Sequence, residues 1–155
     1  MVHRPGLAIK RAEHALIAAK GWALAPFGLT VTEYASLRIL LDHPGTSGAE
    51  VARQCLVTPQ AISFVFANLE RIGLIERRPH PDHGAVREVL LTSAGRALVE
   101  QADRAVLDVE ARFVAGLSDQ DIDLLQRALQ RCADNLVPQR KASRVRSETT
   151  SIASA

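Results

Sequence analysis

The chain has 155 residues, of which 47% are hydrophobic and 23% are charged, and its formal net charge is +2. This composition is ordinary for about one globular domain, and the net charge is too small to indicate nucleic-acid binding by itself. There is no apolar run long enough to span a membrane and no secretory leader, so we expect a cytoplasmic protein without a membrane partner. The two cysteines lie far apart in the sequence, which fits a reducing compartment.

The first two predicted helices lie before residue 45. An Ala-rich helix is expected from Pro5 to about Leu24, and Pro26 and Gly28 break it. Its apolar stripe is narrow and needs a partner. Thr30-Val31-Thr32-Glu33 is a capping box that opens a second helix to about Asp42. The inward positions of this second helix are Tyr34, Leu37, Leu40 and Leu41.

Two further helices follow, separated by a turn of a few residues. Ser47-Gly48-Ala49-Glu50 is a capping box that starts a short helix through about Cys55. Thr58 can cap the next helix, Pro59 suits its first position, and Gly73 can end it in the left-handed conformation. This arrangement is the helix-turn-helix pattern.

Residues 74–78 and 87–91 are β-type runs, separated by a loop from Pro79 to Val86 that is rich in Pro, His, Asp and Gly. They predict a hairpin with a long tip. A helix-turn-helix followed by a hairpin is a winged helix, in which the second helix enters the major groove and the hairpin tip reaches the minor groove.

The last two helices complete a fold that is mainly α with a small β-hairpin. Thr92 is expected to cap a long helix to about Gly116, and Ser118-Asp119-Gln120-Asp121 opens the final helix. The predicted inward positions are Leu98, Ala102, Ala105, Val109 and Phe113 in the first of them and Ile122, Leu125, Leu129, Cys132 and Leu136 in the second. Because a winged helix is already complete, these faces predict dimerisation.

Five short segments, in this order and spacing, resemble the MarR family of transcriptional regulators. They are Gly28-Leu29-Thr30, His43-Pro44-Gly45-Thr46-Ser47, Glu50-Val51-Ala52, the run from Leu69 to Arg77, and Leu91-Thr92-Ser93-Ala94-Gly95. The resemblance covers roughly residues 5 to 137. It implies a homodimer, with one winged helix per subunit reading half of a palindromic operator, and it favours a repressor.

The predicted organisation has three parts. Residues 30–96 form the winged helix-turn-helix, and residues 5–29 together with 97–137 form a helical dimerisation region. Residues 138–155 form a basic tail without periodicity, which we expect to be flexible.

The predicted base-reading residues lie on the helix that Thr58 opens. Gln60 can pair with adenine, Ser63 with a base or phosphate, and Ala61 or Phe64 can pack on a thymine methyl group. A solvated helix face, or a core position for Phe64, is the alternative. The full set is Thr58, Pro59, Gln60, Ala61, Ser63, Phe64 and Asn68.

A second set is expected to contact the DNA backbone or to lie on the wing: Ser47, Arg53, Arg71, Arg77, Arg78, His83 and Arg87. The alternative for each arginine is a solvated side chain or an ion pair with a neighbouring glutamate. The resemblance implies an Asp and an Arg two residues apart at the wing tip, but the matching positions here are His83 and Ala85. Which of His83, Arg78 and Arg87 replaces the missing arginine stays open.

The resemblance also implies release from DNA by a small phenolic or aromatic effector. The predicted crevice is lined by His14, Trp22, Phe27 and Tyr34, although the three aromatic residues can instead pack the joint between the first helix and the domain. Cys55 is expected to fill core space rather than to sense oxidants.

No enzyme, metal or cofactor is expected. His80, Asp82 and His83 suggest metal ligands, but a hairpin tip is a poor place for a closed site and no other cluster completes the set. Nucleophile, base and orienting group are not grouped anywhere in the sequence. The competing hypothesis is a winged-helix adaptor that binds protein instead of DNA.

Overall fold

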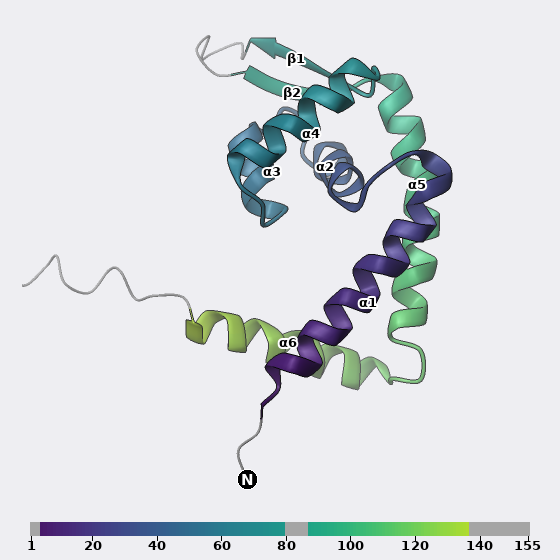
Figure 1. Cartoon of the computed structure of the whole chain (residues 1–155), viewed down its shortest axis with the longest axis vertical. Helices are drawn as coiled ribbons and strands as arrows, with labels where there is room; N and C mark the ends of the chain where they lie inside the picture. The colour runs from purple at the N-terminus through teal and green to yellow at the C-terminus, as the bar shows by residue number, and fades with distance from the viewer. Residues whose placement is uncertain (1–3, 80–86, 137–155) are drawn as a thin grey trace, which may run out of the picture. The chain divides into compact units, whose positions relative to one another are not determined.

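The computed structural model describes residues 4–79 and 87–136, and it divides into two compact units, Met1–Phe113 and Val114–Ala155, which are treated separately. The elements are α1 (Gly6–Leu24), a 3-10 turn η1 (Ala25–Phe27), α2 (Val31–Asp42), α3 (Gly48–Gln54), α4 (Pro59–Arg71), β1 (Ile75–Pro79), β2 (Arg87–Leu91), α5 (Ser93–Phe113) and α6 (Asp119–Leu136). Of these elements, α6 alone belongs to the second unit. The predicted fold class, mainly α with a β-hairpin, is confirmed (Figure 1).

The ends of the helices follow from local side-chain hydrogen bonds. The Thr30 box is complete, because the Glu33 amide donates to Thr30 Oγ1 at 3.2 Å and the Thr30 amide donates to Glu33 Oε2 at 2.8 Å. Thr58 Oγ1 accepts from the Ala61 amide at 3.1 Å, and Gly73, with φ of 75°, follows the end of α4. Both features were predicted.

The capping box predicted at Ser47 is only half formed. Ser47 Oγ accepts from the Glu50 amide at 3.3 Å. The Glu50 carboxylate does not return to the Ser47 amide, since it is bound by the guanidinium of Arg53 and the amide of Gln54. A charged partner one turn along the same helix therefore competes successfully with the backbone.

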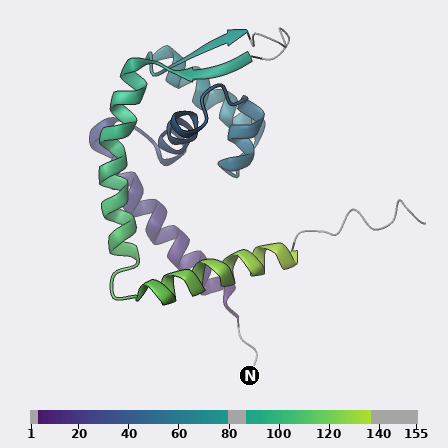
Figure 2. The same ribbon diagram turned by 180° about the vertical axis from the view of Figure 1, so that it is seen from behind.

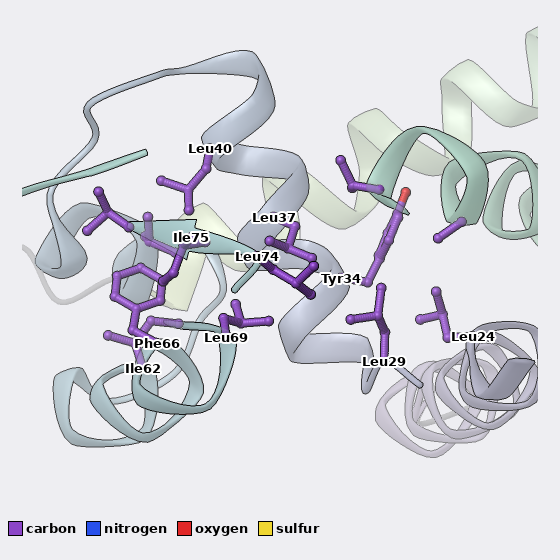
Figure 3. Close-up of a cluster of buried hydrophobic side chains, with 14 of the residues drawn as sticks. Leu24, Leu29, Tyr34, Leu37, Leu40, Ile62, Phe66, Leu69, Leu74 and Ile75 are labelled. Carbon is purple, nitrogen blue, oxygen red and sulfur yellow. The ribbon is translucent and has the colours of Figure 1, made fainter. Parts of the chain in front are cut away.

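The core of the first unit surrounds α2. Leu37 and Leu40 of α2 are fully buried, and they belong to one apolar cluster with residues of α4, of the hairpin and of α5. Figure 3 shows Ile62, Phe66 and Leu69 of α4 at one end of this cluster and Leu24 and Leu29 near α1 at the other. Each of these elements thus takes its place from the same central helix.

The hairpin is antiparallel, and its register pairs Ile75 with Leu91 and Pro79 with Arg87. Ile75 and Val89 are buried against the core, so alternate side chains of the two strands anchor the wing. β1 begins one residue later than predicted, because Leu74 continues the turn in which its amide donates to the Leu69 carbonyl at 2.9 Å.

α5 starts in close contact with the hairpin and then runs beside α1 (Figure 2). Thr92 Oγ1 donates to the Gly73 carbonyl at 2.7 Å and accepts from the Gly95 amide at 3.0 Å, while the Thr92 amide donates to the Leu74 carbonyl at 3.1 Å. Further along, Lys20 of α1 pairs with Glu110 of α5. These contacts fix α5 at both ends of its packed length.

The prediction of which side of α5 faces inward was wrong in part. Ala102 and Val109 are buried as expected, but Leu98 and Ala105 are only half-buried and Phe113 is 42% exposed. The buried stripe is Gly95, Val99, Ala102, Val106 and Val109. This buried stripe is rotated about the helix axis relative to the predicted one, because α5 packs on both α1 and α2. Hydrophobic periodicity alone does not specify these two neighbours.

The second unit contains α6. Ser118 and Asp121 form the predicted reciprocal cap, with Asp121 Oδ2 accepting from the Ser118 amide at 3.2 Å and the Asp121 amide donating to Ser118 Oγ at 3.2 Å. None of the described residues of α6 is buried. Its exposed leucines are Leu124, Leu125, Leu129 and Leu136.

Among the described residues, no single helix combines the length and apolar composition needed to cross a membrane. Gly6–Phe27 and Val31–Asp42 meet those criteria only when taken together, as a pair bent by 77°.

Gly95→Ala should strongly destabilise the first unit. A Cβ atom at Gly95 would lie 2.0 Å from the Leu74 carbonyl oxygen, so the backbone of α5 or of the hairpin would have to move. We expect the free energy of unfolding to fall by at least about 2 kcal/mol in denaturant titration.

Gly21→Ala is the matched control, because a Cβ atom there meets nothing within 4 Å. In a helix interior this change should be neutral or stabilising by up to about 1 kcal/mol. Equal stabilities for the two variants would contradict the close contact at Gly95.

Candidate nucleic-acid interface

The outer side of α4 carries most of the predicted base-reading residues. Pro59, Gln60, Ser63 and Phe64 are exposed, whereas Ile62, Phe66 and Leu69 on the opposite side are buried. Phe64 is 72% exposed, so it does not take the core position that the sequence left open. Ala61 is half-buried, and the hydroxyl of Thr58 is engaged in capping the helix.

These side chains differ in the hydrogen-bonding groups they leave free. Ser63 Oγ donates to the Pro59 carbonyl at 2.9 Å, which leaves its oxygen lone pairs available to a donor. Gln60 makes no side-chain hydrogen bond to the described residues, so both its amide donor and its acceptor face solvent. A side chain with a free donor and acceptor is the type that pairs bidentately with adenine.

Asn68, another of the predicted base-reading residues, is bound by protein partners. Its Nδ2 donates to Glu33 Oε1 of α2 at 2.6 Å, and its Oδ1 accepts from the guanidinium of Arg71 at 2.6 Å. The amide is therefore used on both sides by protein partners and is half-buried. The prediction that Asn68 reads a base is not supported by this geometry.

The predicted arginines at the edges of the interface lie beside protein acceptors. Arg53 is bound to Glu50, Arg71 to Asn68, and Arg78 to Glu76. Hydrogen bonds from Arg53 and Gln54 hold the pKa of the exposed Glu50 carboxyl at about 2. Exposed pairs of this kind contribute little to stability and are screened by salt, so they can exchange for a phosphate partner.

Arg77 is held differently from the other three. Its guanidinium lies over the Phe66 ring at 5.7 Å from the ring centroid, and its Nε is 3.3 Å from Glu70 Oε2. This contact is not a hydrogen bond, and the buried Nε has no hydrogen-bond partner among the described residues. His83 lies outside the described residues, as does the side chain of Arg87, so a wing contact by either stays a prediction.

A hollow of about 210 Å³ lies next to Arg77 and borders the exposed residues Pro59 and Ser63 of α4. It is formed where the starts of α3 and α4 meet the hairpin. Its lining residues are Gly48, Ala49, Pro59, Ile62, Ser63, Phe66, Arg77 and Val89. Sequence reasoning missed this hollow because its lining residues are spread over four elements.

The four residues predicted to line an effector crevice lie in different surroundings. The Tyr34 hydroxyl donates to Asp103 Oδ1 at 2.5 Å, and burial together with that acidic partner raises the pKa of Tyr34. Phe27 packs against the core, whereas His14 and Trp22 are exposed. For Tyr34 and Phe27 the packing alternative describes the structure better.

A second hollow of about 210 Å³ lies between α1 and α5, and it contains none of those four residues. It is lined by Ala15, Leu16, Ala19, Val109, Arg112 and Phe113.

Cys55 is half-buried, with its Sγ 3.8 Å from Ser36 Oγ, and burial raises the pKa of its thiol. A raised pKa disfavours the reactive thiolate, which supports a packing role.

Comparison with known proteins identifies the family of this chain. A MarR family model matches residues 27–85. The HTH-type transcriptional repressor Rv2887 of Mycobacterium tuberculosis is 42% identical over 96 residues, which are 62% of this chain and 69% of the repressor. The chain belongs to the MarR family. It is accordingly a DNA-binding transcriptional regulator, and the family indicates no enzymatic activity.

Solved structures agree with this assignment. The structure of Rv2887 in complex with DNA is 34% identical, has a TM-score of 0.67, and covers 84% of this chain and 98% of its own. CouR from Rhodococcus jostii RHA1, bound to p-coumaroyl-CoA, is 26% identical with a TM-score of 0.78 and covers 83% of this chain and 90% of its own. The predicted winged helix-turn-helix fold is confirmed, and the adaptor hypothesis loses its support.

Leu56→Gly should stabilise this MarR-family protein. Leu56 lies in the turn between α3 and α4 with φ of 56° and is 92% exposed, so it carries left-handed strain without burying apolar surface. We expect the free energy of unfolding to rise by up to about 1 kcal/mol, measured by denaturant titration.

Leu56→Ala is the matched control, because it shortens the side chain but keeps the Cβ atom that causes the strain. Its effect should stay within about 0.5 kcal/mol. A glycine variant no more stable than the alanine variant would show that the turn is unstrained.

Proposed function

We propose that the chain is a homodimeric repressor of a palindromic operator, with α4 of each subunit in a major groove. The observation that carries this is the exposed, uncharged side of α4, where Gln60, Ser63 and Phe64 lie around the start of a capped helix. Such a face supplies amide, hydroxyl and apolar contacts to base edges, while arginines at its border contact phosphates. Rv2887 has been solved with DNA and CouR with a 23-mer DNA duplex.

Exposed apolar side chains support the dimer. α1 and α5 of the first unit leave six of them largely in solvent, and in the second unit α6 carries exposed leucines. Isolated exposed apolar residues are ordinary, but a run of them along packed helices indicates an interface. Those of the first unit are Leu7, Ile9, Ile17, Trp22, Leu107 and Phe113. Their exposure supports the proposed helical dimerisation region.

Gln60→Ala is expected to weaken operator binding about tenfold and to relax specificity at one base pair of each half-site, because a bidentate contact to one base is lost. Fluorescence anisotropy with an operator mapped by footprinting upstream of the protein's own gene measures both effects. Ser93→Ala, which removes an exposed hydroxyl at the start of α5 and outside the predicted dimerisation region, is the control and should bind as the unsubstituted protein does. An unchanged affinity for Gln60→Ala would remove Gln60 from the reading face.

We also propose that a small aromatic carboxylate is the effector and that it binds in the hollow beside Arg77. Rv2887 has been solved with salicylic acid and with p-aminosalicylic acid, both of which are aromatic carboxylates. Here Arg77 belongs to the lining of a hollow with apolar walls from Ile62, Phe66 and Val89. Its buried Nε lies 3.3 Å from Glu70 Oε2 and has no hydrogen-bond partner among the described residues. A carboxylate would satisfy this guanidinium, and the ring would pack on the walls.

Arg77→Met should lower the affinity for salicylate at least tenfold in isothermal titration calorimetry, since a charge-assisted hydrogen bond is lost while the aliphatic stem is kept. Arg78→Met, at the exposed neighbouring position of β1, should leave it unchanged. Arg112→Met tests the hollow between α1 and α5. Loss of binding in Arg112→Met but not in Arg77→Met would place the effector there instead.

A further inference from the structure

Glu33 is an acidic residue of α2 that is only 7% exposed and uses both carboxylate oxygens. Oε2 accepts from the Thr30 amide at 2.8 Å and from the Thr30 hydroxyl at 3.0 Å, and Oε1 accepts from Asn68 Nδ2 at 2.6 Å. Burial raises the pKa of Glu33, but the hydrogen bonds from Thr30 and Asn68 outweigh it, so the net direction is downward. The carboxylate is therefore a fixed acceptor that joins the start of α2 to α4.

Asn68 is the partner on α4, and its amide has only one orientation that satisfies its neighbours. The NH₂ group must face the Glu33 carboxylate, because the oxygen must face the Arg71 guanidinium. Arg71, at the last position of α4, is one of the predicted phosphate contacts. The chain of contacts from Glu33 through Asn68 to Arg71 thus begins in the core and ends at the expected DNA backbone.

The remaining contacts of α4 with the core are apolar and non-directional. Ile62, Phe66 and Leu69 hold α4 against α2, and burial of apolar surface does not by itself select one orientation of the helix about its axis. A hydrogen bond restricts such rotation, because it weakens steeply away from a linear geometry. Each turn of α4 carries one side chain toward the expected groove, so a small rotation would misalign Gln60 and Ser63 together.

We propose that Asn68 is a positioning residue that sets the rotation of α4 through Glu33 and holds Arg71, and that it does not itself read a base. The inference rests on the proposed DNA-binding mode and assigns Glu33, which is buried, a role in operator affinity.

The test exchanges the two hydrogen-bonding partners. Asn68→Asp faces the Glu33 carboxylate with a second carboxylate, and operator affinity should fall at least tenfold. In the double variant Glu33→Gln/Asn68→Asp, the introduced glutamine can accept from Thr30 through its carbonyl and donate its NH₂ group to the introduced aspartate, which still accepts from Arg71. This double variant keeps the original net charge, and its operator affinity should return to within about threefold of the starting value.

Glu33→Gln alone also leaves one unfavourable contact, with either Thr30 or Asn68, so it should weaken operator binding even though it removes a negative charge. Ala67→Asp is the control for charge, since Ala67 is an exposed neighbour on α4, and Glu33→Gln should not rescue it. Affinities for the operator and for a scrambled duplex are measured by anisotropy, and thermal unfolding confirms that each variant is folded.

A double variant that stays as weak as Asn68→Asp would overturn the assignment, and so would a Glu33→Gln variant that binds as the unsubstituted protein does. Both results are expected if Asn68 reads a base. Absence of specific binding by the unsubstituted protein would instead refute the proposed DNA-binding mode, so the two failures are distinguishable.

Discussion

The structure depends on α2, whose neighbouring residues Glu33 and Tyr34 make directional contacts to different elements. Glu33 accepts from Asn68 of α4, and Tyr34 donates to Asp103 of α5. Farther along α2, Leu37 and Leu40 fill the centre of the apolar core. Apolar burial supplies the larger share of stabilisation, whereas the two hydrogen bonds define the angles at which α4 and α5 sit. The helices α4 and α5 therefore share one reference element.

The arginines around α4 have protein partners when no DNA is bound. Arg53, Arg71 and Arg78 each have a protein acceptor within a few residues, so the free protein does not present these three as a cluster of unpaired cations. These contacts lie at the surface, where an ion pair contributes roughly 0 to 1 kcal/mol. For Arg53 and Arg78, exchanging the glutamate for a phosphate then costs little, and the gain comes from the counterions that DNA releases.

Local chemistry explains what the sequence predicted well and what it did not. The caps at Thr30, Thr58 and Ser118 and the glycine after α4 involve partners within a few residues, so their patterns are visible in the sequence. Asn68 was expected to read a base because its partner Glu33 lies 35 residues away. Tyr34 was expected at a crevice because Asp103 lies 69 residues away. The contacts of polar residues on amphipathic helices are thus hardest to predict when tertiary structure supplies their partners.

The hollow beside Arg77 overlaps the face of α4 that we propose for DNA binding. Pro59 and Ser63 belong both to its lining and to the exposed side of α4. A ligand seated there would occupy space that a DNA duplex needs, so binding of the two would be mutually exclusive without any change in the angle between subunits. Reciprocity then requires DNA to weaken the ligand by the same factor. A ligand between α1 and α5 has no such overlap and would have to act indirectly, through α2 or through the hairpin that α5 also contacts.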